Sequence, residues 1–389
     1  MTSFSLKNSS LNLRALALLF ALIGICIFFN VITDGIFLSA KNITNLTRQS
    51  SIVGLLAIGM VMVIVSGNID LSVGSLTGLT GGLSAIIAVS FGWSLPMVIL
   101  ATILIGVTAG MVQGFIVAYL RVPAFIVTLG GLMIFRGVIK GATHGGTITV
   151  DTAYQYFGGG FLTENQGWIV AAIAIVAIMV QSWRTYSSKK LHGLKQNPLW
   201  LTMATPLFYS LIIIGFILIF NSNDVKFPTS PAENDKSIPV PVMMWLLLAL
   251  LLHLLATKTT FGRRVFAIGG NSEAAYLSGI NIKWNTLLVF VITGFLSAMA
   301  GIVYTARVGS ATAAAGRNLE LDAVAACVIG GTSLMGGRGT ISGAIVGALI
   351  MSSLDNGMSI MNIEDFYQDI IKGLVLVLAV YMDVVSKKK

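Results

Sequence analysis

The sequence predicts an all-α polytopic membrane protein with about twelve transmembrane helices and both termini in the cytoplasm. Charged residues make up 10% of the 389 positions and apolar residues 56%, whereas soluble domains carry roughly 25% charged residues. The mean hydropathy is +0.89. The apolar residues also gather in runs near the length of about 20 residues that a helix needs to cross a bilayer. A chain so poor in charge cannot cover a soluble surface.

The first run, residues 13–32, is longer than the ~7–15-residue core of a signal peptide and lacks a small-x-small site at its end. We therefore interpret it as an uncleaved first span. Later spans are shorter where a helix is broken inside protein. The expected spans are residues 13–32, 51–66, 71–91, 95–120, 123–141, 167–183, 201–220, 240–256, 285–304, 320–335, 340–354 and 366–383.

The distribution of Lys and Arg among the loops predicts the orientation of these spans in the membrane. With the N-terminus inside, fifteen Lys and Arg fall in cytoplasmic stretches and eight in outer stretches, while Lys372 lies within the last span. Cytoplasmic loops carry the excess of basic residues, so the count predicts both termini inside, and this placement matters more than the net charge of +9. The tryptophans lie at or near expected span ends, where aromatic side chains sit at the headgroup level; they are Trp93, Trp168, Trp183, Trp200, Trp245 and Trp284.

The outer loops 142–166 and 221–239 are too short for a soluble domain, so we expect one transmembrane domain over residues 1–389. The long polar stretch is 257–284, which the loop charges place in the cytoplasm. Within it Asn271 can cap a short helix, Glu273 lies in its first turn and Gly279 can end it. A helix of about two turns is unstable alone, so it needs a partner's groove. A solvated loop with one helical turn is the alternative, and the local residues leave both open.

Two glycine-rich segments interrupt the apolar runs. Residues 59–82 begin as a span that is broken around Asp70, and Gly74, Gly78 and Gly82 then repeat at a spacing that lets helix backbones approach closely. Asp70 is costly in hydrocarbon, so it either caps the following helix, which we favour, or faces an aqueous path or the interface. A similar pattern occupies 339–347, and short, glycine-broken segments indicate a transport pathway.

Neither a catalytic nor a metal site is indicated. The three histidines, His144, His192 and His253, are scattered over two loops and a span end, and the sequence contains no G-x-x-x-x-G-K-[ST] phosphate loop. Cys26 and Cys327 lie in apolar runs, as small buried thiols do. We therefore expect a chain that is not an enzyme, has no cofactor and does not hydrolyse ATP.

Several motifs resemble the membrane permease subunits of bacterial ABC importers for pentoses and related sugars. They are VSGNIDLSVGS at 65–75, VPAFIVTLGGLMIFRG at 122–137, FGRRVFAIGGNSEAAYLSGI at 261–280 and LDAVAACVIGGTSLMGGRGT at 321–340. Glu273-Ala274-Ala275 followed by Gly279 matches the E-A-A-x-x-x-G core of the importers' coupling segment. The apolar-Pro ending that some importers show after this core is missing, as is common in the sugar branch.

The resemblance implies a ten-helix importer core with an inserted basic loop and helix pair at 184–239. This insertion and the chain length resemble the xylose members, which makes D-xylose the expected sugar. The implied assembly is a homodimeric pore in the bacterial cytoplasmic (inner) membrane, with a periplasmic sugar-binding protein outside and an ATPase subunit, which binds the ATP, docked inside on 271–279.

Two groups of candidate site residues follow. The ATPase-coupling residues are Arg263, Arg264, Asn271, Glu273, Ala274, Ala275, Leu277 and Gly279. The translocation-pathway residues are Asn68, Asp70, Ser72, Phe125, Thr128, Glu320 and Asp322. Arg263 and Arg264 either pair with acidic residues of the ATPase or are ordinary cytoplasmic loop charge.

Three alternatives stay open. One is a permease for another pentose or hexose. A second is a secondary transporter driven by an ion gradient, which would need carboxylates or histidines at mid-span, and Asp70 is the main candidate for such a group. A third is a scaffold membrane protein, which would not need the glycine-broken segments.

Overall fold

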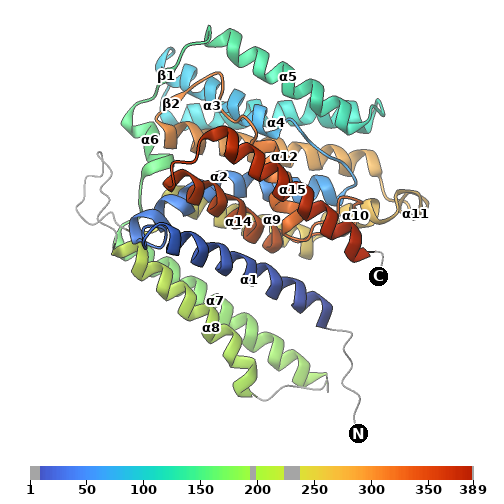
Figure 1. Ribbon diagram of the computed structural model, residues 1–389. Helices are drawn as coiled ribbons and strands as arrows, with labels where there is room; N and C mark the ends of the chain where they lie inside the picture. Colours follow the sequence, from blue (N-terminus) through green and yellow to red (C-terminus); the bar gives the residue numbers. More distant parts are fainter. Residues whose placement is uncertain (1–8, 193–198, 223–236, 388–389) are drawn as a thin grey trace.

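The computed structural model describes residues 9–192, 199–222 and 237–387, and these form a helical bundle (Figure 1). The helices in the first half are α1 (Ser9–Ile32), α2 (Ala40–Val65), α3 (Val73–Val89), α4 (Leu95–Ala118), α5 (Ala124–Ala142), α6 (Thr152–Gly159) and α7 (Glu164–Leu191). Those in the second half are α8 (Leu199–Asn221), α9 (Val240–Lys258), α10 (Thr260–Gly270), α11 (Ser272–Leu277), α12 (Ile282–Val308), α13 (Leu319–Ile329), α14 (Ile341–Ile360) and α15 (Asp365–Lys387). Two short strands, β1 (Ile148–Thr149) and β2 (Ser310–Ala311), pair antiparallel.

Helix α2 is the centre of the core. Its apolar side chains from Ile52 to Val65 are buried, and α9, α12, α13 and α14 pack around them. The window that qualifies α2 as a candidate span is 89% buried inside the protein. A helix that is apolar all round belongs in such a place, because it has no polar face to expose.

Close contacts between small residues hold the central helices together. A Cβ added at Gly74 or Gly78 of α3 would overlap the backbone at Gly316 or Ala315, just before α13, and one at Gly343 would overlap Gly330 at the end of α13. The predicted close packing is thus confirmed at these positions, because membrane helices gain van der Waals contact where side chains are small.

The helix pair α7 and α8 lies at the periphery and diverges from the bundle in Figure 1. The span window of α7 is only 11% buried. The pair is anchored near one end by a small cluster that includes Ala171, Ile217, Phe220 and Val242. Part of the predicted 184–239 insertion, namely 193–198 and 223–236, lies outside the described residues.

The two ends of the bundle differ. At one end β1 pairs with β2, and α6 packs on α12, where the hydroxyls of Tyr154 and Ser84 are hydrogen-bonded. At the other end α10 packs against α9 and α2, and α11 projects from the bundle. The first described residues of α1 and the end of α15 lie on the same side as α11 (Figure 1).

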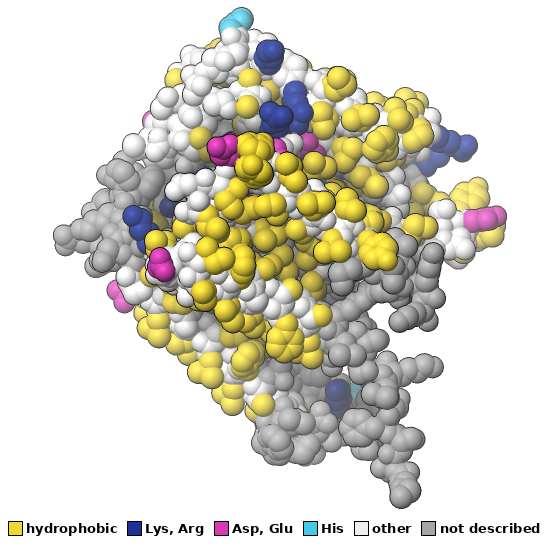
Figure 2. All heavy atoms as spheres, viewed as in Figure 1, with side chains coloured by type: hydrophobic (Ala, Val, Ile, Leu, Met, Phe, Trp, Pro, Cys, Tyr) yellow, Lys and Arg dark blue, Asp and Glu magenta, His cyan; other side chains and the backbone are white. Residues whose placement is uncertain are grey.

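Eight helices in the described part of the chain are long and apolar enough to cross a membrane: α2, α4, α5, α7, α8, α9, α12 and α14. Shorter apolar helices occur at Leu16–Ile32 and Val73–Val89. Figure 2 shows that hydrophobic side chains cover most of the visible described surface, with charged groups sparse. The predicted class, a mostly helical polytopic membrane protein, therefore agrees with the structure, and the exact count of twelve spans stays a prediction.

One of the tryptophans near the span ends is buried inside the protein. Trp245 of α9 is 3% exposed and packs on Gly54 of α2, inside the core. Glycine leaves room there for an indole, so Trp245 is a packing residue. Trp93, Trp183 and Trp284, in contrast, are exposed.

Candidate functional site

The polar stretch 257–284 holds two helices where the sequence predicted one. Thr259 caps α10, since its hydroxyl accepts a hydrogen bond from the Gly262 N–H at 3.2 Å. Val265 and Ile268 are buried, while Arg263 and Arg264 are exposed. The sequence analysis missed α10, which the threonine cap and the helical spacing of the two apolar residues could have predicted.

Helix α11 has the predicted caps. The Asn271 Oδ1 accepts from the Ala274 N–H at 2.9 Å, and Glu273 lies in the first turn. Gly279 has a left-handed φ of 79°, and the Ile280 N–H reaches back to the Ala275 carbonyl at 3.1 Å. This pair of features is a Schellman ending, which satisfies carbonyls of the last turn.

The predicted coupling residues on α11 are exposed, apart from Ala275, which packs the helix onto the protein. Tyr276 and Leu277 are 69% and 79% exposed. Exposed apolar side chains on a short, well-capped helix at the tip of a polar segment suit docking into a groove of a partner.

The segment after α2 leaves helical geometry at Gly67, where φ is 83°. Asp70 is buried, and its Oδ1 accepts from the Ser72 N–H at 2.8 Å and the Ser72 hydroxyl at 2.6 Å. The expected cap thus takes another form, because Asp70 binds the N-cap residue of α3 rather than an N–H in its first turn. An acid beside a helix N-terminus is still favourably placed with respect to the helix dipole.

Gln113 of α4 completes this network and was missed by the sequence analysis. Its Nε2 donates to the Ser72 hydroxyl at 2.9 Å, and the side chain is buried. The sequence marks Gln113 only as a single amide side chain within an otherwise apolar run. Buried polar atoms need partners, so Asp70, Ser72 and Gln113 fix α3 to α4.

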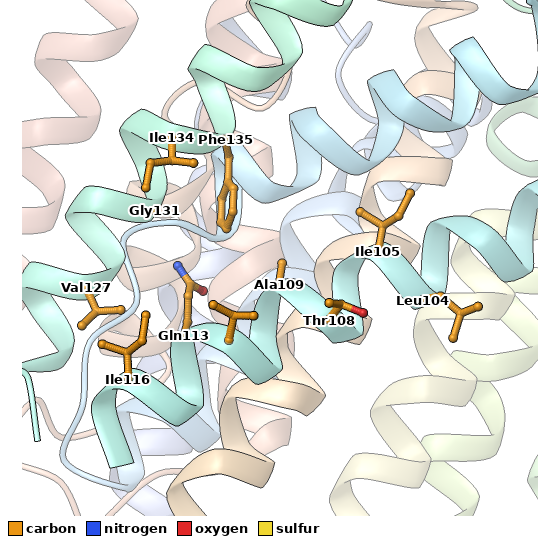
Figure 3. A pocket seen from close by; sticks show the side chains of 11 residues that line it. Leu104, Ile105, Thr108, Ala109, Gln113, Ile116, Val127, Gly131, Ile134 and Phe135 are labelled. Carbon is orange, nitrogen blue, oxygen red and sulfur yellow. The ribbon is translucent and has the colours of Figure 1, made fainter. Parts of the chain in front are cut away.

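A cavity of about 510 Å³ lies between α4 and α5, and Figure 3 shows the Gln113 amide pointing from α4 into it. Its other lining is apolar apart from Thr108 and includes Val112, Ile116 and Ile134. An apolar lining of this kind offers a sugar few hydrogen bonds.

Other predicted pathway residues gather along α5 instead. The Thr128 hydroxyl lies 3.4 Å from the Ile69 carbonyl oxygen. Farther along the helix, Arg136 Nη2 lies 3.2 Å from Glu320 Oε1. Glu320 also packs against Gly74 in the first turn of α3. The N-terminal ends of two short helices, α3 and α13, therefore meet beside α5, an arrangement that lines binding sites in broken-helix transporters.

Asp322 faces away from this group, as expected for a residue two positions from Glu320 on a helix. Lys372 Nζ of α15 lies 3.5 Å from Asp322 Oδ1 and 3.3 Å from Asp355 Oδ1 of α14. Of the remaining pathway residues, Asn68 donates to the Ser66 hydroxyl at 3.0 Å, and Phe125 is exposed on α5. The sequence analysis missed the roles of Arg136, Asp355 and Lys372 as partners.

Comparisons with known proteins identify the family to which the chain is similar. A family model described as a branched-chain amino acid transport system / permease component matches residues 42–380. The xylose transport system permease proteins of Escherichia coli and Haemophilus influenzae are 44% and 45% identical, and each alignment covers 98% of this chain and 94% or 99% of the relative. The ribose import permease protein of Haemophilus influenzae is 35% identical over 89% of this chain and 86% of its own length. No solved structure gives a significant match.

Proposed function

The chain belongs to the family of branched-chain amino acid transport system / permease components, and we propose that it is the membrane permease subunit of a binding-protein-dependent ABC importer for D-xylose. The observation that carries this proposal is the 44–45% identity over nearly the full length to two xylose permeases. The ribose permease is more distant at 35%, which makes another pentose or hexose the second candidate.

The protein is a multi-pass protein of the bacterial inner membrane. We infer a total of twelve spans, a ten-helix importer core plus the pair that the insertion at 184–239 adds, with both termini in the cytoplasm. A helix lies in each predicted span, although α13 (Leu319–Ile329) fills only the first part of the span predicted over 320–335. The fifteen-to-eight bias of basic residues supports the orientation. The first described residues of α1, the end of α15 and α11 share one side (Figure 1), which also supports it.

Three partners belong to the proposal: an ATPase subunit, a periplasmic sugar-binding protein and a second copy of this chain. The ATPase binds the ATP and receives α11, on which Tyr276 and Leu277 are exposed for docking. ATP binding and hydrolysis there displace α11 and shift the permease between outward-open and inward-open states. The sugar passes the polar groups beside α5, and the exposed face of that helix, which includes Phe125, faces the pore of the homodimer.

One observation favours ion-coupled transport as the rival function. Asp322, Asp355 and Lys372 form a mostly buried charge cluster, and ionisable groups inside a membrane often serve ion or proton transfer. The two functions differ in their energy source, so a single uptake assay separates them.

The assay uses proteoliposomes that contain the permease and its ATPase, with the binding protein added outside. We expect labelled xylose to enter only with ATP inside and with the binding protein, and an ionophore to have no effect. Uptake without the ATPase that collapses with the ionophore would establish the rival function. Competition by unlabelled ribose, arabinose and galactose tests the sugar.

The coupling role of α11 is tested by Glu273→Lys. Reversing the charge in the first turn opposes the helix dipole and changes the docking surface, so the variant should insert normally but uncouple sugar uptake from ATP hydrolysis. Immunoblots of membranes check insertion, and paired uptake and ATPase assays check coupling. Normal uptake would contradict the assignment of α11.

A further inference from the structure

The coupling segment meets the helical bundle through backbone contacts in addition to buried side chains such as Val265. The Gly337 N–H donates to the Val65 carbonyl at 2.9 Å. Gly269, in the last turn of α10, packs on the same carbonyl, and a Cβ at this position would overlap the oxygen. The end of α2 is thus held between α10 and the loop that joins α13 to α14.

Glycine is needed on both sides of this contact. Gly336 and Gly337 have φ values of 84° and 70°, which side-chain-bearing residues rarely adopt. A Cβ at Gly336 would lie 2.7 Å from the Gly269 carbonyl oxygen and 3.2 Å from the Gly67 Cα. Three segments far apart in the sequence therefore approach to backbone distance at one point.

Each segment leads to a different part of the proposed machinery. Gly269 is followed directly by α11, and Val65 is followed by the broken segment that carries Asp70 and Ser72. The loop with Gly337 is closed on itself by a hydrogen bond from the Ser333 N–H to the Arg338 carbonyl at 2.9 Å.

We propose that Gly269, Gly336 and Gly337 clamp the Val65 carbonyl in a rigid joint, through which displacement of α11 moves the Asp70–Ser72 segment. The inference rests on the proposed function, in which an ATPase displaces α11. Long side chains can absorb a displacement by changing rotamer, whereas backbone atoms in contact cannot, so packed interfaces of this kind shift as units. The three glycines are positioning residues: they act through Val65 on the hydrogen bonds that join Ser72 to Asp70 and to Gln113.

The first test compares Gly269→Ala with Gly270→Ala in the complete importer. Both positions lie in the last turn of α10, but an added Cβ at Gly270 meets no atom within 4 Å. We expect Gly269→Ala to co-purify with the ATPase, to hydrolyse ATP without stimulation by the sugar-loaded binding protein, and to lose uptake by roughly tenfold or more, since small misplacements are costly. Gly270→Ala should match the unmodified protein in all three measurements.

Uptake by Gly269→Ala within about twofold of Gly270→Ala would overturn the joint, because 0.4 kcal/mol corresponds to about a factor of two. Failure of the proposed function looks different, since the unmodified protein and Gly270→Ala would then also lack ATP-driven uptake.

The second test leaves the glycines intact, so it holds even where Gly269→Ala fails to fold. Spin labels are placed at Ser272→Cys, which is exposed at the start of α11 and is not one of the proposed docking residues, and at Met335→Cys, which is also exposed. Cys26 and Cys327 are replaced by alanine, and each complex carries one labelled copy. A second pair joins Ser272→Cys to Leu120→Cys, which is exposed just after α4.

Between the nucleotide-free and ATP-trapped states, the 272–335 distance should stay constant while the 272–120 distance changes. A 272–335 distance that changes as much as the 272–120 distance would overturn the joint. A constant 272–120 distance would overturn it as well, since α11 would then not move against α4.

Discussion

The two ends of α13 are held by opposite means. At its N-terminal end, Glu320 pairs with Arg136 of α5, and Asp322 lies with Asp355 and Lys372. At its C-terminal end, Gly330 packs against the backbone of Gly343 in α14. Charged side chains therefore surround the N-terminal end of this eleven-residue helix, where Gly74 of α3 also approaches closely, whereas the C-terminal end meets the backbone of α14.

This difference has a mechanical consequence. Charged side chains can exchange partners, including water or a solute hydroxyl, when a path opens beside them. Backbone contacts through glycine have no such alternative, so the glycine end transmits displacement. We infer that the charged end of α13 is where the protein changes its contacts during transport, and that the glycine end is where it receives the motion.

The largest expected effect comes from Lys372→Met at the charged end. Removal of the ammonium group leaves Asp322 and Asp355 without their shared counter-charge, and breaking a buried ion pair costs about 3–5 kcal/mol. Thermal unfolding in detergent should show this loss. The control is Lys140→Met, which removes a lysine exposed on α5. Equal stability of the two variants would mean that charge pairing does not hold the N-terminal end of α13.

A smaller effect is expected from Gly343→Val at the glycine end. A Cβ there would overlap the Gly330 carbonyl oxygen, so α13 and α14 must separate, and overpacking of this kind costs about 1–3 kcal/mol. Gly373→Val in α15 is the matched control, because its added Cβ meets no atom within 4 Å. If both variants unfold at the same temperature in detergent, the close helix contact contributes little.

Structural features that depend only on residues close together in the sequence could be predicted. The caps at Asn271 and Gly279 depend on residues within one turn of each other, so α11 was predicted with both of its ends. The apolar runs likewise predicted where the candidate spans occur, because the length and composition of an apolar stretch are set by its own residues.

Features that depend on distant residues were not predictable. The partner of Glu320 is 184 positions away at Arg136, and no sequence pattern joins them. The sequences of α2 and α7 both qualify as apolar spans, yet the candidate-span window of α2 is 89% buried inside the protein and that of α7 only 11%. Trp245 lies near a span end but fills the space beside Gly54. In each case the neighbours that decide the outcome come from another part of the chain.

The smallest effect on stability is expected from Glu320→Gln. This variant is also the sharpest test of the difference between the two ends of α13. Arg136 is 39% exposed, so solvent screens its pairing with Glu320, and loss of the charge should cost no more than about 1 kcal/mol. Glutamine keeps the shape of the side chain and a carbonyl acceptor for Arg136.

If the charged end of α13 borders the sugar path, uptake by Glu320→Gln should nevertheless fall several-fold, because a carboxylate accepts stronger hydrogen bonds from sugar hydroxyls than an amide does. The measurement is labelled-xylose uptake per permease at equal melting temperature, with Lys41→Met, which removes a lysine exposed at the start of α2, as the surface control. Uptake equal to that of the unmodified protein would place the path away from Glu320, and the N-terminal end of α13 would then be held by charge for stability alone.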